Sequence, residues 1–284
     1  MTPRIVSYAQ NQEDVVLARL FAEQPSGCYL DVGAAHPLKD SVTKHFYDLG
    51  WRGINVEPNP ELFELLAAER PGDVNLRLAV SDAPGEATLH LYADPTLWGV
   101  ATLDDREVAR NPQYARTFAV EVSTVASICE RFLGNRHIDF MKIDVEGYER
   151  NVLLGVDWER HHPRVLVIEA TRPNSRVPTH HEWEDVVTAA GYRSVLFDGL
   201  NRFYAGVDDD EAASVLGAPA SVLDNYVTCD HLAACDRADR LQAGLDTLHG
   251  QVSQLAQLAR TLRARCEQLE TQRSSPQTAG VPGR

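Results

Sequence analysis

The sequence is poor in cysteine and shows no pattern among the cysteines it has. The five cysteines are scattered, and no two of them form a CxxC pair, so neither a disulfide framework nor a zinc site is indicated. No run of about 18 apolar residues is present, which argues against a membrane-spanning helix. The first residues contain no apolar signal core, so we expect a protein of the reducing cytoplasm.

Basic residues are also scarce. The 284 residues include 41 acidic and 27 basic ones, a formal charge of −14, which argues against nucleic acid as a partner. Only three of the basic residues are lysines, at positions 39, 44 and 142, so a lysine inside a motif is conspicuous. The chain is 44% apolar and 24% charged, as expected for a globular protein with a substantial core.

Short apolar runs alternate with helical patterns over most of the chain. Strands separated by helices predict an α/β fold with a doubly wound parallel sheet. The last two runs are joined by Asp198-Gly199, which predicts an antiparallel hairpin at one edge. The runs that we expect to form strands are residues 27–33, 53–57, 74–80, 138–144, 164–169, 192–197 and 201–206.

The ends of the predicted strands carry the polar residues that suggest a ligand site. Ligands of open parallel sheets bind beyond the carboxyl ends of the strands. The turn after the first strand begins at Gly33 but lacks the other glycines of GxGxxG, which disfavours a dinucleotide. S-adenosylmethionine is smaller and fits an open turn at Gly33 and a carboxylate for its ribose at Glu57.

Several motifs resemble the FkbM family of S-adenosylmethionine-dependent O-methyltransferases. They are residues 7–17, 30–34, 51–58 and 142–149; residues 169–175, 178–180 and 198–204 resemble a bacterial branch found beside sugar-modifying genes. The resemblance covers roughly residues 5–206. It implies the Rossmann-like class I methyltransferase fold, with seven strands and the last strand inserted antiparallel, and methyl transfer to a hydroxyl, commonly on a sugar or polyketide.

The resemblance also implies roles for single residues. Asp31 and Gly33 would line the methionine end of the cofactor, Glu57 would hold the ribose, and Asp82 would lie near adenine. Lys142, Asp144 and Glu146 would face the transferred methyl group. Ala34, Asn59 and Ser81 are the remaining candidates for cofactor binding. Simpler roles stay open: Lys142 as the ion-pair partner of Asp144, and Asp82 as a turn residue.

An alcohol acceptor must lose its proton during methyl transfer, and a well-placed base accelerates such a step by about 10²–10⁴-fold. The candidates for this base are Asp144, Glu146, Glu169 and His36. A divalent cation held by Asp144 and Glu169 is the alternative, because it would lower the pKa of the hydroxyl directly. We also expect residues 98–103, within the unpatterned stretch 93–117, to belong to the acceptor site.

A heptad pattern follows the alternating region. Leucine recurs every seven residues from Leu241 to Leu269, with Leu245, Val252, Ala259 and Cys266 between. This spacing predicts a coiled coil that forms a homo-oligomer through residues 236–272; an amphipathic helix lying on the globular domain is the alternative. The predicted organisation is a methyltransferase domain over 1–232, a coiled-coil helix over 233–273 and a disordered tail over 274–284.

The most specific hypothesis is methyl transfer to a hydroxyl of a saccharide or glycoconjugate. Two alternatives remain at this point. One is a methyltransferase that acts on a protein or a small metabolite. The other is a catalytically silent, cofactor-binding scaffold of a glycan-assembly complex.

Overall fold

The computed structural model describes residues 4–94 and 99–274. It divides into two compact units, Met1–Thr228 and Cys229–Arg284. The first unit extends to strand β13 (Tyr226–Thr228), which pairs in parallel with β1 (Ile5–Ser7). Helix α9 starts directly after β13, at Cys229, whereas the sequence pattern predicts the boundary after residue 232.

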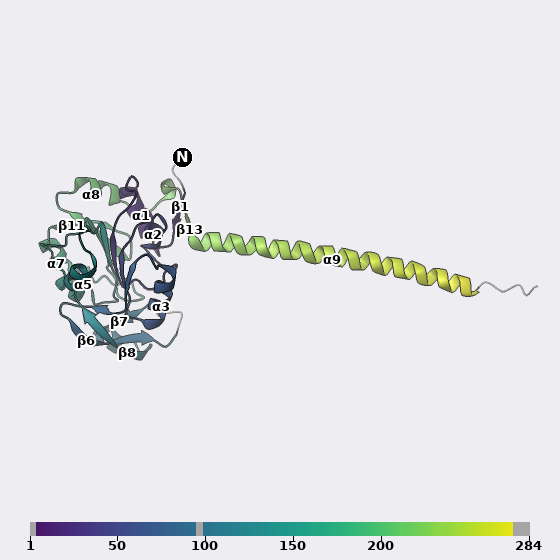
Figure 1. Cartoon of the computed structure of the whole chain (residues 1–284), viewed down its shortest axis with the longest axis horizontal. Helices are drawn as coiled ribbons and strands as arrows, with labels where there is room; N and C mark the ends of the chain where they lie inside the picture. The colour runs from purple at the N-terminus through teal and green to yellow at the C-terminus, as the bar shows by residue number, and fades with distance from the viewer. Residues whose placement is uncertain (1–3, 95–98, 275–284) are drawn as a thin grey trace, which may run out of the picture. The chain divides into compact units, whose positions relative to one another are not determined.

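The first unit is built around a seven-stranded sheet, drawn in Figure 1. The predicted doubly wound sheet is confirmed: six strands run in the same direction, and β12 runs antiparallel between β10 and β11. The predicted hairpin turn at Asp198-Gly199 joins β11 to β12. The strands, in their order across the sheet, are β11 (Tyr192–Phe197), β12 (Asn201–Gly206), β10 (Val165–Glu169), β9 (Phe140–Ile143), β2 (Tyr29–Val32), β3 (Ile54–Val56) and β4 (Val74–Leu76).

Helices cover both faces of this sheet because successive strand residues point to opposite sides. In β10, Val165 and Val167 belong to one buried cluster, and Leu166 and Ile168 belong to another. The first cluster includes residues of α1 (Glu13–Leu20), α2 (Lys44–Asp48) and α8 (Asp210–Leu216). The second includes residues of α5 (Val125–Phe132), α6 (Glu149–Leu154) and α7 (Glu184–Ala189).

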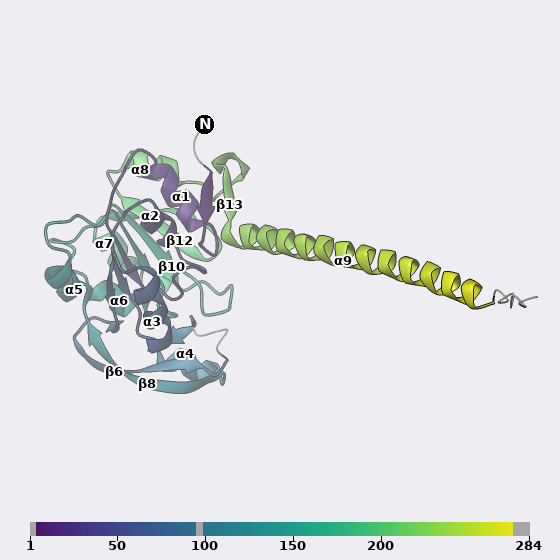
Figure 2. The ribbon, with the colours of Figure 1, turned by 45° about the vertical axis from the view of Figure 1, so that its right-hand side comes forward.

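A separate four-stranded sheet corrects one sequence prediction. Residues 74–80 do not form one strand: β4 pairs with β3, whereas β5 (Ala79–Val80) pairs with β8 in the second sheet. The apolar run is continuous, but its two halves have different partners, and period-2 patterning does not report partners. Figure 2 shows the long antiparallel pair of this sheet, β6 (Gly85–Tyr92) and β8 (Tyr114–Ser123).

The stretch 93–117 also contains regular structure, although it lacks periodicity in the sequence. It includes β7 (Ala101–Thr102), helix α4 (Asp105–Arg110) and the start of β8. These elements are shorter than the windows in which a period can be recognised. Two 3₁₀ turns, η2 (His180–Glu182) and η3 (Val222–Asp224), complete the unit together with α3 (Pro60–Glu69).

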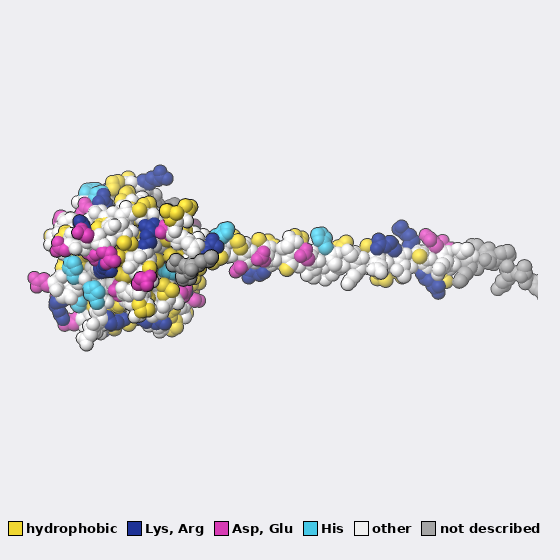
Figure 3. Space-filling model, turned by 90° about the horizontal axis from the view of Figure 1, so that it is seen from above, with side chains coloured by type: hydrophobic (Ala, Val, Ile, Leu, Met, Phe, Trp, Pro, Cys, Tyr) yellow, Lys and Arg dark blue, Asp and Glu magenta, His cyan; other side chains and the backbone are white. Residues whose placement is uncertain are grey.

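The second unit contains helix α9 (Cys229–Ser274), a single helix of 46 residues. Its heptad leucines, from Leu241 to Leu269, are between 50% and 71% exposed, and Figure 3 shows hydrophobic side chains among polar and charged ones along it. No helix within the described ranges is long and apolar enough to cross a membrane. Residues 275–284 of the predicted tail lie outside the described residues.

Candidate active site

A pocket opens at the carboxyl ends of β2, β3 and β9, and three of the predicted site residues line it. Including its open mouth, it encloses about 560 Å³. Gly33, Glu57 and Asp144 line it on the side of the large sheet. Apolar residues from both sheets complete the wall, among them Val56, Leu78, Val80, Leu89 and Leu103.

Gly33 forms the turn at the floor of this pocket. Its φ of +80° lies in the left-handed region, and a Cβ there would stand 1.8 Å from the carbonyl oxygen of Asp144. Its backbone N–H donates to Val56 O at 3.0 Å, and Asp144 N–H donates to Val32 O at 3.0 Å. Only glycine therefore allows β2 and β9 to approach so closely at their ends.

Glu57, at the end of β3, ties the glycine turn to helix α3. Its Oε2 accepts from Ala35 N–H at 2.8 Å, and its Oε1 accepts from Asn59 N–H at 2.8 Å. Burial raises the pKa of Glu57 to about 7. A carboxylate offers about four lone-pair positions, so both oxygens can accept further bonds from hydroxyls of a ligand in the pocket.

Lys142 lies beneath the pocket and is 6% exposed. The register of β2 and β9 places it opposite Asp31. Its ammonium donates to Gly33 O at 2.6 Å and lies 3.3 Å from Asp144 Oδ2 and 3.6 Å from Asp31 Oδ1. Burial by itself lowers the pKa of Lys142, but Asp144 and Asp31 outweigh burial and raise it. Lys142 thus holds together the turn and the carboxylates around it.

Three carboxylates gather beside Lys142. Asp144, Glu146 and Glu169 each place one oxygen within 4.8 Å of the other two. Burial, followed by the charge of Asp144, raises the pKa of Glu146 well above its usual value. Burial, followed by the charge of Glu146, does the same for the pKa of Glu169. Glu146 and Glu169 therefore hold a proton more tightly than an exposed carboxylate does.

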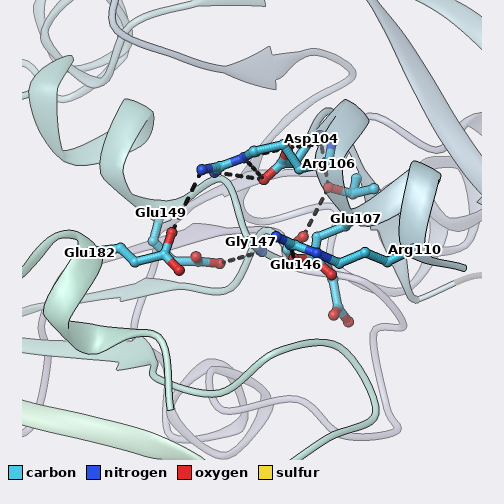
Figure 4. Close-up of polar contacts among 9 residues, drawn as sticks. Asp104, Arg106, Glu107, Arg110, Glu146, Gly147, Glu149 and Glu182 are labelled. Atoms are coloured by element: carbon cyan, nitrogen blue, oxygen red, sulfur yellow. Dashed lines mark hydrogen bonds and ion pairs between the residues drawn. The ribbon is translucent and has the colours of Figure 1, made fainter. Parts of the chain in front are cut away.

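A polar cleft adjoins the pocket, and Tyr148 lines both. It lies between α4, α6 and η2 and measures about 940 Å³, its open mouth included. Figure 4 shows Arg106 extending from α4 toward Glu182 of η2; their charged atoms are 3.8 Å apart. On its other side, the Arg106 guanidinium donates a hydrogen bond to Asp104 Oδ2 at 2.8 Å. The cleft is therefore walled by charged side chains held in place by one another.

Several predicted site residues lie elsewhere and serve the surrounding loops. His36 Nδ1 accepts from the N–H groups of Leu38 and Lys39, both at 3.1 Å. Asn59 caps α3, accepting from Glu61 N–H at 3.0 Å. Of the predicted cofactor and base residues in the described chain, those that do not line the pocket are Asp31, Ala34, His36, Asn59, Ser81, Asp82, Lys142, Glu146 and Glu169.

Ser81 and Asp82 bond to each other at 2.8 Å, and this bond, followed by one from Asn151, lowers the pKa of Asp82. Gly99, Ala101 and Leu103 of the predicted acceptor loop line the pocket. Trp98 lies outside the described residues.

Sequence reasoning missed most of the pocket's second wall and the whole polar cleft. Leu78, Ala79 and Val80 form part of the pocket, but the sequence pattern predicts them at the end of a strand in the large sheet. Arg106 lies in no motif, and Glu182 follows the motif over 178–180 without belonging to it. Tyr148 stands inside the motif over 142–149, so its proximity to Asp144 was the one usable signal.

The strand order, the antiparallel β12 and the pocket at the glycine turn define a class I methyltransferase fold. The sequence matches the family model for the methyltransferase FkbM domain over residues 31–194. This match covers more than half of the chain, and the chain belongs to the FkbM methyltransferase family.

Two solved structures resemble this one. One is a TehB-like SAM-dependent methyltransferase from Corynebacterium glutamicum, with 11% identity, a TM-score of 0.37, and coverage of 68% of this chain and 87% of that chain. The other is a precorrin-6y C5,15-methyltransferase from Geobacter metallireducens, with 15% identity, a TM-score of 0.36, and coverage of 72% and 92%. No curated protein matches the sequence.

Proposed function

We propose that the protein transfers a methyl group from S-adenosylmethionine to a hydroxyl of a saccharide or glycoconjugate. The observation that carries this proposal is the shared wall at Tyr148: a pocket suited to a nucleoside joins a cleft lined by charged groups. The carboxylate cluster contributes Asp144 to the pocket, and its Glu146 precedes Gly147 of the cleft.

The residues of the pocket fit the methyl donor. Val56, Leu78, Val80 and Leu89 offer an apolar slot for an adenine ring. The free lone pairs of Glu57 suit the two hydroxyls of a ribose. When bound, S-adenosylmethionine supplies a methyl group on a positively charged sulfur.

The polar cleft fits a neutral, hydroxyl-rich acceptor. Its wall contains four carboxylates, Asp104, Glu107, Glu149 and Glu182, and two guanidiniums, Arg106 and Arg150. Carboxylates accept and guanidiniums donate hydrogen bonds, so together they suit hydroxyls, which do both. The excess of negative charge disfavours a phosphorylated or polyanionic acceptor.

The protein's contribution to the reaction is alignment and proton acceptance. Holding the acceptor oxygen in line with the methyl carbon removes much of the entropic barrier. As the oxygen–carbon bond forms and the sulfur–carbon bond breaks, the hydroxyl proton passes to a carboxylate. Asp144 is the nearest candidate, because it alone of the three clustered acids lines the pocket.

The test is transfer of an isotopically labelled methyl group to panels of saccharides, proteins and small metabolites. We expect labelled saccharide, with Asp144→Asn slowing transfer and leaving the affinity for S-adenosylhomocysteine within about tenfold. Arg106→Gln should raise KM for the acceptor without changing that affinity. Label found only on proteins or metabolites would show that the acceptor is not a saccharide. Binding of S-adenosylhomocysteine without any methyl transfer would support the catalytically silent scaffold.

We also propose that α9 forms a coiled coil between copies of the chain. Its heptad leucines are at least half exposed, and an isolated helix with such a stripe is only marginally stable in water. Pairing the stripes of two or more chains removes this apolar surface from water.

A further inference from the structure

We propose that Asp144, Glu146 and Glu169 together bind one divalent cation of the oxygen-preferring kind, such as Mg²⁺, Mn²⁺ or Ca²⁺. The role of this cation in catalysis rests on the proposed function, whereas its binding does not. The three side chains come from the end of β9, the following turn and the end of β10, so only the folded sheet assembles them.

The spacing of the carboxylates suits a cation. Their nearest oxygens all lie within 4.8 Å of one another. Two oxygens on opposite sides of Mg²⁺ stand about 4.2 Å apart, and on opposite sides of Ca²⁺ about 4.6–5.2 Å. A cation can therefore bind all three residues with side-chain adjustments alone.

The hydrogen bonds around the cluster supply a second, independent argument. Glu169 is 6% exposed, and its Oε2 has no hydrogen-bond partner among the described residues; the same holds for Glu146 Oε2. Two neighbours, Glu57 at 4% and Glu149 at 2% exposed, are different. Glu57 accepts two backbone N–H bonds, and so does Glu149, from Val145 at 3.3 Å and Gly147 at 3.0 Å.

A buried carboxylate oxygen without a donor is costly, so a cation or a proton is needed beside it. Backbone N–H groups of the chain satisfy the carboxylates of Glu57 and Glu149. Glu146 and Glu169 instead direct oxygens toward each other and toward Asp144.

Charge balance points the same way. The cluster carries three negative charges when ionised, and the ammonium of Lys142 contacts only Asp144 among them. Lys142 is also shared with Asp31 and with the carbonyl of Gly33. A divalent cation would neutralise the negative charge of the cluster that Lys142 does not balance.

Protons are the competing occupants of the cluster. The raised pKa values of Glu146 and Glu169 agree with either occupant, because each reflects burial and the neighbouring charges. A cation competes with protons for the same oxygens, so its affinity must rise with pH. A cation bound in the cluster would lie beside the pocket, where it would lower the pKa of the acceptor hydroxyl.

The experiment uses the full chain after treatment with a chelator, without donor or acceptor. It is titrated separately with MgCl₂, MnCl₂ and CaCl₂ at pH 6 and pH 8, and binding is followed by calorimetry, by melting temperature and, for Mn²⁺, by electron paramagnetic resonance. We expect saturable binding of one cation per chain, tighter at pH 8.

Glu169→Gln should weaken this binding at least tenfold, whereas Glu64→Gln, which removes an exposed carboxylate of α3, should bind the cation as the wild type does. Glu169→Gln should also fold well, because without metal it relieves repulsion between carboxylates. Its melting temperature should match or exceed that of the metal-free wild type and rise less on adding metal.

The outcomes separate the two proposals. Absence of saturable binding by all three cations at pH 8 overturns the cation site and leaves protons as the occupants. Binding that Glu169→Gln and Asp144→Asn leave unchanged also overturns it, since the cation then lies elsewhere. Cation binding in a protein that methylates no saccharide supports the site and overturns only the proposed acceptor.

Discussion

Replacement of Lys142 by methionine tests the network beneath the pocket most directly. The substitution keeps the length and much of the volume of the side chain but removes the charge. Asp31 is 1% exposed and would keep one bond, from Thr43 Oγ1 at 2.7 Å. The Gly33 carbonyl would lose its donor at 2.6 Å. Removing one partner of a buried ion pair typically costs about 3–5 kcal/mol, so we expect a loss of that size in the free energy of unfolding.

The assay is urea denaturation in the presence of a chelator, so that a bound cation does not contribute. Midpoint and slope together give the free energy of unfolding. The double variant Lys142→Met with Asp31→Asn should recover part of the loss, because it no longer leaves a buried charge behind. Lys39→Met, at an exposed lysine, is the matched control and should change stability by less than about 0.5 kcal/mol. A loss below about 1 kcal/mol for Lys142→Met, or a double variant with no recovery, would refute the reasoning.

Three further predictions concern other parts of the chain. Glu57→Gln should weaken S-adenosylhomocysteine binding by about 1.5–3 kcal/mol, as a lost bond to a charged group does; unchanged affinity in calorimetry would contradict the ribose role. Burial raises the pKa of Glu13 from 4.5 to about 8, so its stabilising contribution is complete below about pH 4.5 and is lost as the pH rises through about 8. Glu13→Gln should therefore gain stability relative to the wild type between pH 5 and pH 8, and a constant difference in urea denaturation would argue against a buried, protonated Glu13. Truncation after residue 232 should reduce the mass found by light scattering to that of a monomer. If the full-length and the truncated protein are both monomers, or are oligomers with the same number of chains, the coiled coil is ruled out as the oligomerisation element.

Local patterns in the sequence were sufficient for much of the fold. The apolar runs identified the strands of the large sheet, and Asp198-Gly199 identified the hairpin. Asn59 and Pro60 are residue types that suit the start of α3, where Asn59 caps the helix, and the motifs over 30–34 and 142–149 pointed to the family. These signals are local, because burial on one or two faces, a cap or a positive φ leaves its mark within a few residues of chain.

Only the tertiary structure decided which residues meet. The sequence placed Glu146 and Glu169 at strand ends, but the register of neighbouring strands brings them together, each with one buried oxygen that lacks a hydrogen-bond partner among the described residues. The run over 74–80 is divided between two sheets because β5 finds its partner in β8, more than 40 residues further along the chain. His36 followed the first strand as a candidate base, yet its Nδ1 accepts from the backbone of its own loop. Hydrogen-bond partners and charge neighbours of this kind depend on contacts between distant segments, and no short-range periodicity records them.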